Sequence, residues 1–327
     1  MNIDSTHPFY TGELILPTST IDVVINKILY WYTYSIPGGV LWSYPRVGKS
    51  TAIEYIKINK AKIFNIDVPI FSYIADTKDY KKSPNNFYKS LLNKFNWAEE
   101  IDTSHIKGGV TDNENRLVKL FTSRAIDTPE KKLIFIIDEA QYLGINELEL
   151  LKSLTNKVRA NGVKVISVLL GEPELNDKRK WLKQSRKTHL ISRFFAQEER
   201  VPGLRSRKDI ENLLRGYDLF DVKHKGKKCS TSNYFAPKAY REGFRLQNYS
   251  KEVWELFTRT SEKYKQPYLD LEISTEIFFI YCMHLFYKIN KQDNEELLLT
   301  TQFLEEAMTP EVEKLIFDYS QTIVDYN

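Results

Sequence analysis

The sequence has few cysteines and few glycines. Its only cysteines among 327 residues are Cys229 and Cys282, and neither belongs to a CxxC pair. A disulfide framework or a zinc site is therefore not expected. We expect two reduced thiols in a reducing compartment. Glycine occurs 13 times, against 20 tyrosines and 18 phenylalanines. This composition is typical of a chain that folds around an apolar core, and it argues against disorder.

Long hydrophobic runs are also missing. The longest apolar stretch, residues 277–286, is too short to span a bilayer and contains His284. The N-terminus shows no basic region followed by an apolar run, so no signal peptide is expected. We therefore expect a cytoplasmic protein with no membrane partner.

Acidic residues dominate only the C-terminal end. Residues 293–327 contain nine acidic residues and one basic residue, which gives this tail a net charge of −8. Because the whole chain carries +4, the residues before the tail carry +12. A basic body favours an electrostatic partner such as nucleic acid, although an ordinary basic domain would explain the excess equally well.

Apolar strand patterns alternate with amphipathic helix patterns up to about residue 205. Strands are expected at residues 40–42, 63–74, 133–137 and 163–170, and helices at 14–36, 52–58, 85–95, 113–126 and 147–158. This alternation predicts an α/β fold with a parallel sheet covered by helices on both faces. Helical patterns dominate afterwards, and residues 222–232 look like a loop. We expect one α/β domain over residues 1–205 and a helical lid and C-terminal region over 206–327.

A phosphate-binding loop is predicted between the first strand and the helix that follows it. The loop reads Ser43-Tyr44-Pro45-Arg46-Val47-Gly48-Lys49-Ser50-Thr51. Backbone N–H groups of such a loop converge on phosphate at a helix N-terminus, and Gly48 lets the backbone come close. Lys49 would reach the β- and γ-phosphates of ATP, while the Ser50 hydroxyl would ligate Mg²⁺. Ser43 departs from the usual GxxxxGK[ST] pattern, which begins with glycine.

Two carboxylates follow a five-residue apolar run about 90 residues downstream. The run, residues 133–137, is typical of a strand buried on both faces, and Asp138 and Glu139 come directly after it. Ligands of parallel sheets bind at this end of the strands. Asp138 would hold Mg²⁺ directly or through water, and Glu139 would polarise the water that attacks the γ-phosphoryl group. Glu139 favours hydrolysis over simple binding.

Further candidates lie after the next strand. Glu172 is placed to contact the γ-phosphate or the attacking water, although a structural turn with Pro173 starting a helix explains the same residues. Arg193, with Arg186 as second choice, is the candidate for a finger that reaches the γ-phosphate of a neighbouring subunit. A surface ion pair is the alternative for these arginines. Arg241 and Arg245 are candidates for a second sensor.

Several lysines are candidates for contact with DNA phosphates. Lys78, Lys81 and Lys82 follow the strand expected at residues 63–74, and Lys119 lies further along. Flexible cations at a groove or pore can bind the DNA backbone without reading its sequence. A solvated basic loop explains the same lysines. The cluster at residues 223–228 is a weaker candidate of the same kind.

These motifs together resemble TnsC, the AAA+ regulator of Tn-seven-like transposons, and its TniB and ExeA-type relatives. The resemblance covers residues 20–205, and its most specific parts are the phosphate loop at 44–50, the Ile-Asp-Glu-Ala-Gln run at 137–141, the Gly-Glu-Pro-Glu-Leu turn at 171–175 and the Ser-Arg-Phe run at 192–194. Length and composition are similar to the TnsC of CRISPR-associated type I-F systems.

The resemblance implies activities that the residues alone do not. TnsC-like proteins assemble with ATP into rings or filaments around double-stranded DNA, here expected to hold roughly six or seven subunits per turn. They connect a TniQ-type target selector to the TnsA–TnsB transposase. The alternatives are an ExeA-like AAA+ ATPase and an ATP-binding scaffold without a DNA role. An ExeA-like protein should carry a transmembrane segment and a peptidoglycan-binding region, and neither is visible in the sequence.

Overall fold

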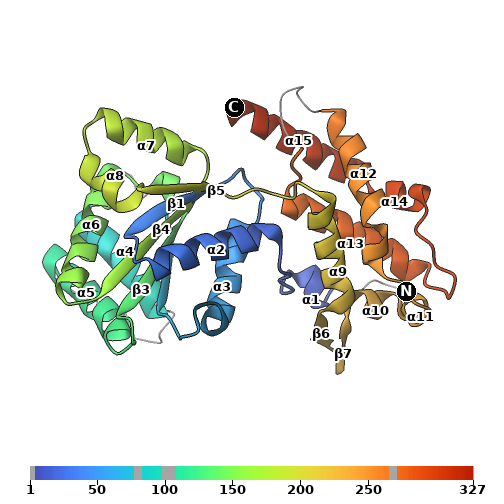
Figure 1. Ribbon diagram of the computed structural model, residues 1–327, viewed down its shortest axis with the longest axis horizontal. Coiled ribbons are helices and arrows are strands. Elements are labelled where there is room, and N and C mark those ends of the chain that lie inside the picture. Colours follow the sequence, from blue (N-terminus) through green and yellow to red (C-terminus); the bar gives the residue numbers. More distant parts are fainter. Residues whose placement is uncertain (1–3, 77–82, 98–107, 265–270, 327) are drawn as a thin grey trace. The chain divides into compact units, whose positions relative to one another are not determined.

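The computed structural model in Figure 1 describes residues 4–76, 83–97, 108–264 and 271–326. The chain forms two compact units. One is made of Val24–Ser43 and Ala52–Val201, and is called the sheet unit here. The other, the helical unit, is made of Met1–Val23, Tyr44–Thr51 and Pro202–Asn327. No helix in the described part of the chain is long and apolar enough to cross a membrane. The expected division after residue 205 stays a prediction.

The sheet unit is built on a five-stranded parallel sheet, as the alternating patterns predicted. Its strands lie in the order β2 (Ile70–Ile74), β3 (Lys132–Asp138), β4 (Lys164–Gly171), β1 (Gly38–Trp42) and β5 (Gln197–Arg200). All four neighbouring pairs are parallel. Parallel strands need crossover connections, and in this chain the crossovers contain the helices that cover the sheet (Figure 1).

The helices that accompany the sheet follow the expected order. They are α2 (Ser19–Thr33), α3 (Lys49–Phe64), α4 (Pro84–Trp97), α5 (Val110–Ile126), α6 (Ile145–Ala160), α7 (Glu174–Gln184) and α8 (Thr188–Phe194). Helices α4, α5, α6 and α8 share one apolar core with one face of the sheet. Helix α2 packs close to β1, where a Cβ on Gly39 would lie 2.4 Å from the Trp31 ring. Glycine is therefore required at that position.

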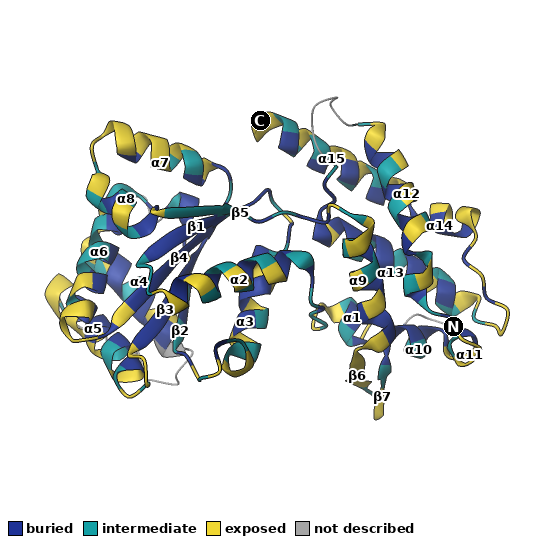
Figure 2. Cartoon of the chain, viewed as in Figure 1, coloured by how far each residue is buried: buried dark blue, intermediate teal, exposed yellow. Residues whose placement is uncertain are grey.

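The central strands are buried along most of their length, as Figure 2 shows by colour. All seven residues of β3 are buried, and in β4 only Lys164 is exposed. Leu133, Phe135 and Ile137 belong to the core shared with α4, α5 and α6. Ile134 and Ile136 point to the opposite face and are fully buried too. The apolar run at 133–137 therefore has the two-sided burial that the sequence predicted.

Two expectations from the sequence were wrong. The strand expected over residues 63–74 begins only at Ile70, because α3 continues through Phe64 and ends where Asn65 takes a φ of 59°. Residues 222–232 are not simply a loop. They contain the hairpin of β6 (Asp221–His224) and β7 (Lys227–Ser230), whose two-residue turn, Lys225 and Gly226, has positive φ at both positions.

The helical unit packs around buried polar anchors as well as apolar side chains. Its helices are α1 (Pro8–Thr11), α9 (Arg207–Leu219), α10 (Thr231–Phe235), α11 (Pro237–Arg241), α12 (Ser250–Glu262), α13 (Thr275–Lys291), α14 (Thr301–Ala307) and α15 (Pro310–Tyr326), with the 3₁₀ turn η3 (Leu246–Tyr249). The buried carboxylate of Asp218 accepts hydrogen bonds from the Ser232 hydroxyl and from the N–H groups of Leu246 and Gln247. One side chain thus joins α9, α10 and η3.

The N-terminal segment is fastened to this unit by Asp4 and His7. The Asp4 carboxylate accepts from Lys225, Thr6, Tyr234 and His224, and these bonds, the one from Lys225 foremost, hold the pKa of Asp4 well below its usual range. The fully buried His7 ring caps α1, since its Nδ1 accepts from the Phe9 N–H. Burial, and secondarily the charge of His224, lowers the pKa of His7 to about 4, against the raising effect of Asp4.

This burial predicts an acid-sensitive contribution to stability. The unfolded chain binds a proton at His7 near pH 6.5 and the folded chain only near pH 4, so the contribution is complete above pH 6.5 and is lost as pH falls towards 4. We expect the free energy of unfolding to fall by about 2 kcal/mol between pH 7 and pH 5 through this group.

Urea titrations at both pH values measure the effect. In His7→Asn, which keeps a capping side chain without the titration, the loss between pH 7 and pH 5 should be smaller by that amount. Equal losses in the two proteins would show that His7 is not the responsible group.

Candidate nucleotide-binding site

Three strands of the sheet unit end at one edge of the sheet, and each is followed by a predicted site residue. The register pairs Trp42 of β1 with Gly171 of β4, and Ile137 of β3 with Leu169 of β4. The Ser43 N–H donates to the Gly171 carbonyl at 3.2 Å, which ties the start of the phosphate loop to the end of β4. Ser43, Asp138 and Glu172 therefore leave the sheet at the same carboxyl edge, where α/β proteins bind ligands.

The phosphate loop has the backbone that its sequence suggested, except at its first position. Gly48 has a φ of 95°, a conformation that favours glycine, and Arg46 has a φ of 62°. Ser43 is fully buried and is not among the described residues with positive φ. The first position therefore does not need the conformational freedom of glycine, which explains why serine serves there.

Contacts inside the helical unit hold the phosphate loop in shape. The Arg46 carbonyl accepts the Ser274 hydroxyl at 2.7 Å and the Glu276 N–H at 3.2 Å, so the N-terminus of α13 fixes the middle of the loop. The Lys49 side chain is only 7% exposed, and its ammonium lies 3.4 Å from the Tyr44 carbonyl. The lysine is thus held over its own loop at the start of α3.

An apolar cavity of about 300 Å³ lies beside the phosphate loop within the helical unit. Its lining comes from three separated parts of the chain, including Leu14, Leu16, Val47, Gly48, Phe279 and Ile280. The sequence did not identify this cavity, because residues 9–21 and 275–283 show only the apolar spacing of ordinary core. Its size and apolar walls suit an aromatic ring system attached to a phosphate group.

Asp138 and Glu139 form a tight turn at the end of β3. Asp138 is 9% exposed, and its Oδ1 accepts the Glu139 N–H at 3.0 Å. Glu139 has a φ of 54° and a ψ of 36°, the left-handed region. For a residue with a side chain this conformation costs about 1–3 kcal/mol, and such strain concentrates at functional sites. The turn points the chain away from the strand and into the 3₁₀ turn η2 (Ala140–Tyr142).

Gln141 connects this turn to the end of β4. Its side-chain N–H donates to Glu139 Oε2 at 2.6 Å, and its Oε1 accepts the Glu172 N–H at 3.3 Å. A Cβ on Gly171 would lie 2.3 Å from that same Oε1, so the backbone of β4 comes close enough only because the residue is glycine. Gln141, which is 5% exposed, therefore fixes the direction of the Glu139 carboxylate.

Lys178 of α7 donates hydrogen bonds to the backbone that follows the turn. Its ammonium donates to the carbonyls of Ala140 (3.3 Å), Gln141 (2.6 Å) and Leu143. Burial lowers the pKa of Lys178 to about 8, although the charge of Glu147 acts in the opposite direction. The sequence did not indicate this role, because Lys178 lies in a helix rich in charged residues, typical of a protein surface. The role depends on where α7 packs.

The remaining candidates occupy more varied surroundings. Pro173 caps α7, so residues 172–174 do start a helix, and whether Glu172 also senses phosphate stays a prediction. Arg193 is half-buried in α8 and donates from Nε to the Thr155 hydroxyl at 3.2 Å, and burial lowers its pKa. Arg186 lies exposed after α7 with a φ of 56°. The choice between these arginines as an intersubunit finger stays open.

The candidates for a second sensor make local contacts. Arg245 donates to the carbonyls of Tyr240 and Phe244, and its guanidinium lies 3.7 Å from the Tyr240 ring centroid. Arg241 donates to the Pro237 carbonyl at 3.1 Å. Both arginines therefore have a structural role, and their role as sensors stays a prediction.

The proposed DNA lysines are only partly described. Lys78, Lys81 and Lys82 lie outside the described residues. Lys119 is exposed on α5, and the basic cluster at residues 223–228 forms the β6–β7 hairpin and its turn. Contact of any of these lysines with DNA stays a prediction.

Solved structures of AAA+ proteins are similar to this chain in outline. A Drosophila ORC structure bound to DNA aligns at 10% identity and a TM-score of 0.44, over 89% of this chain and 60% of that one. The Cdc6p of Pyrobaculum aerophilum aligns at 11% identity and a TM-score of 0.43, over 99% of this chain and 90% of that one. The S. cerevisiae Hsp104–ADP complex aligns at 16% identity and a TM-score of 0.45, over 93% of this chain and 43% of that one.

The assignment of the fold rests on a family match and on the sheet. No curated protein matches the chain. Residues 38–178 match the AAA domain family, and they hold the phosphate loop, β1 to β4 and the Asp138-Glu139 turn. With its five parallel strands and helical C-terminal region, the chain has the P-loop AAA+ fold.

Proposed function

We propose that this protein binds and hydrolyses ATP with Mg²⁺. One observation carries the proposal: Asp138 and Glu139 leave β3 at the same sheet edge where the phosphate loop leaves β1. The loop supplies backbone donors for phosphate at the start of α3, which is where a helix attracts anions. Lys49 would exchange the Tyr44 carbonyl for the β- and γ-phosphates.

The metal would be held by few protein ligands. Mg²⁺ prefers hard oxygen atoms and usually takes only one or two from the protein, with the rest from phosphates and water. The Ser50 hydroxyl and the Asp138 carboxylate match that chemistry. The bound ion would neutralise charge on the β- and γ-phosphates.

Glu139 is the residue we assign to water activation. A carboxylate one position after the metal ligand can accept a hydrogen bond from the water that attacks the γ-phosphorus in line. Gln141 holds one of its oxygens, Oε2. The other oxygen can then orient the water. Arg193 would complete the site of a neighbouring subunit by stabilising charge in the transition state.

The apolar cavity beside Gly48 would hold the adenine ring. It touches the phosphate loop at Val47, Gly48 and Thr51, so a nucleotide could place its base in the cavity and its phosphates on the loop. Helix α13 lines the cavity, and Ser274 at its N-terminus donates to the Arg46 carbonyl of the phosphate loop. A bound nucleotide would therefore contact both the loop and α13. This gives ATP a way to change the stability of the helical unit.

The resemblance to TnsC refines the proposal to an ATP-gated assembly factor on double-stranded DNA. In this proposal ATP favours a ring or filament around the duplex, and hydrolysis releases it. The assembly would connect a TniQ-type selector to the TnsA–TnsB transposase. The net charge of +12 on residues 1–292 supports a DNA partner.

The substitution Glu139→Gln tests the assignment of the base. It keeps the size and the hydrogen bond to Gln141 but cannot accept a proton. We expect ATP turnover to fall by about 10²- to 10⁴-fold, while ATP affinity stays within about threefold of wild type. Phosphate release and equilibrium binding of a fluorescent ATP analogue measure the two quantities. Wild-type turnover in the variant would remove Glu139 from the chemistry.

The same variant tests the assembly proposal by a second readout. With ATP and duplex DNA, assemblies of Glu139→Gln should persist in sedimentation runs, whereas wild-type assemblies should disperse as ATP is consumed. If neither protein sediments with DNA in the presence of ATP, the DNA-assembly proposal is wrong, even if ATP turnover is normal.

Lys178 is proposed as a positioning residue for Glu139, and its proton provides a specific test. As pH rises through about 8, the ammonium loses one of the N–H groups that serve three carbonyls. We expect wild-type turnover to decline over that range. In Lys178→Met, turnover should be about tenfold lower at pH 7 and no longer decline near pH 8. An unchanged pH profile in the variant would assign Lys178 a purely structural role.

A further inference from the structure

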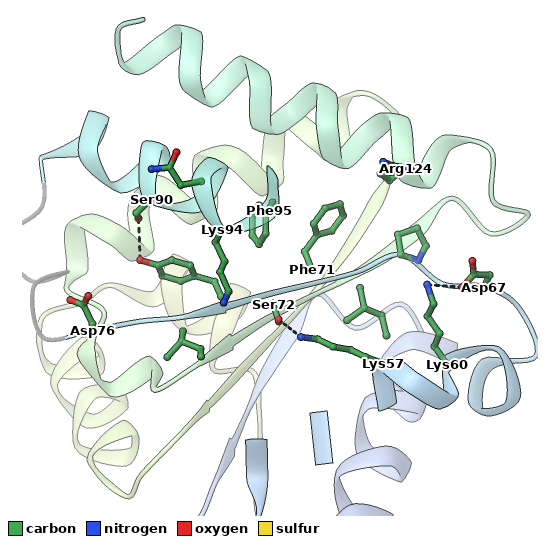
Figure 3. Close-up of a pocket in the computed structure, with 15 residues that line it drawn as sticks. Lys57, Lys60, Asp67, Phe71, Ser72, Asp76, Ser90, Lys94, Phe95 and Arg124 are labelled. Carbon is green, nitrogen blue, oxygen red and sulfur yellow. Dashed lines mark hydrogen bonds and ion pairs between the residues drawn. The ribbon is translucent and has the colours of Figure 1, made fainter. Parts of the chain in front are cut away.

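The exposed edge of β2 forms the floor of a large groove in the sheet unit. The groove has a volume of about 1400 Å³ and is lined by β2, by α3 on one side and by α4 on the other (Figure 3). Strand β2 is an edge strand, and in the described part of the chain no strand pairs with its outer side. The groove follows the outer edge of β2, and at Ile74, which pairs with Asp138, it reaches the carboxyl edge of the sheet.

The backbone of β2 presents alternating donors and acceptors to this groove. The Pro69 carbonyl accepts the Ile134 N–H, and the Ala75 N–H donates to the Asp138 carbonyl, so odd-numbered residues bond to β3. In a parallel ladder the intervening residues direct both groups to the other side. Ile70, Ser72 and Ile74 thus point their N–H and C=O groups into the groove.

Positive side chains flank this edge on both faces of the sheet. Lys57 reaches across from α3 to the Ser72 hydroxyl, and Lys94 extends toward β2 from α4 on the opposite face (Figure 3). Among the described residues, Lys60 and Arg124 also line the groove, together with the acidic residues Asp76 and Asp67, the second of which is paired with Lys60 at 2.6 Å. The lining therefore has a net positive charge. Burial, and secondarily the charge of Lys94, lowers the pKa of Lys57, while the charges of Glu54 and Asp138 act in the opposite direction.

The groove suits a peptide strand better than a nucleic acid backbone. A phosphodiester chain offers only acceptors along its length, so it could bond to the exposed N–H groups but would leave the carbonyls of Ile70, Ser72 and Ile74 unmatched. A peptide strand supplies both kinds of group in the spacing of the ladder. Successive side chains of an added strand point to opposite faces, so two adjacent acidic residues would meet Lys57 and Lys94.

We propose that the β2 edge is a docking site for an extended acidic peptide segment of a partner protein, which adds to the sheet as a sixth strand. Backbone hydrogen bonds to Ile70, Ser72 and Ile74 would give affinity, and the flanking lysines would select a segment with adjacent glutamates or aspartates. The proposal does not depend on ATP turnover.

A labelled peptide tests the site on the full chain. The probe is an eight-residue fluorescein-labelled peptide of valine and threonine with two adjacent glutamates at its centre, and its affinity is measured by fluorescence anisotropy. We expect saturable binding to the wild type. The double variant Lys57→Glu/Lys94→Glu should weaken binding by about tenfold or more. The matched control Lys183→Glu, an exposed charge on α7, should leave the affinity unchanged.

Two N-methylated peptides separate strand addition from simple charge attraction and need no protein variant. One carries N-methyl groups at the odd positions and the other at the even positions, so only one of them loses the N–H groups that face β2. We expect one peptide to bind like the parent and the other to lose binding. Absence of parent binding, or equal binding of both methylated peptides, would overturn the proposal. So would displacement of the parent peptide by a single-stranded oligonucleotide whose own binding depends on Lys57 and Lys94.

Discussion

The burial of β1, β3 and β4 on both faces limits where this chain can place charged groups. An unpaired carboxylate inside such a strand would cost several kcal/mol, because no water or counter-charge could reach it. The chain therefore keeps residues 133–137 apolar and places Asp138 and Glu139 only where β3 reaches the edge of the sheet. The same constraint acts on β1, which is apolar up to Trp42 and then turns into the phosphate loop. The candidate site lies where these buried strands reach the edge of the sheet.

The turn at Glu139 shows how the fold holds a strained residue in place. Its left-handed backbone is unfavourable, and the hydrogen bonds from Gln141 and Lys178 offset the cost. These two side chains also join the turn to β4 and to α7. A shift of α7 would therefore reach the carboxylate proposed to activate water.

The sequence predicted the parts of the site that are contiguous in the chain. Lys49 and Ser50, or Asp138 and Glu139, can be found because a strand pattern and the polar residues after it lie side by side in the sequence. The parallel sheet and most helices followed from periodicity for the same reason. By contrast, the cavity beside Gly48 combines residues from the N-terminal segment and from α13, and Lys178 acts only because α7 packs under η2. Such contacts depend on tertiary packing and leave no local pattern.

The two wrong predictions of secondary structure, at residues 63–74 and 222–232, also had local causes. Ile63 and Phe64 have strand-like side chains, but they lie in the last turn of α3, where the helix continues until Asn65 changes the sign of φ. The charged segment at residues 222–232 lacked apolar residues, yet Lys225 and Gly226 supply the two left-handed residues that a tight hairpin needs. In both places the structure turns at residues with positive φ, one at the end of α3 and two in the hairpin, which side-chain polarity does not indicate.

We propose above all that the phosphate loop and the Asp138-Glu139 turn act on one nucleotide. A crystal structure of the protein with Mg²⁺ and a non-hydrolysable ATP analogue tests it most directly. We expect phosphates on the backbone amides at residues 48–51, an ion bound by Ser50 and Asp138, and the base in the cavity lined by Leu16 and Ile280. A nucleotide bound with Asp138 and Glu139 remote from its γ-phosphate would show that the loop and the turn do not form one site.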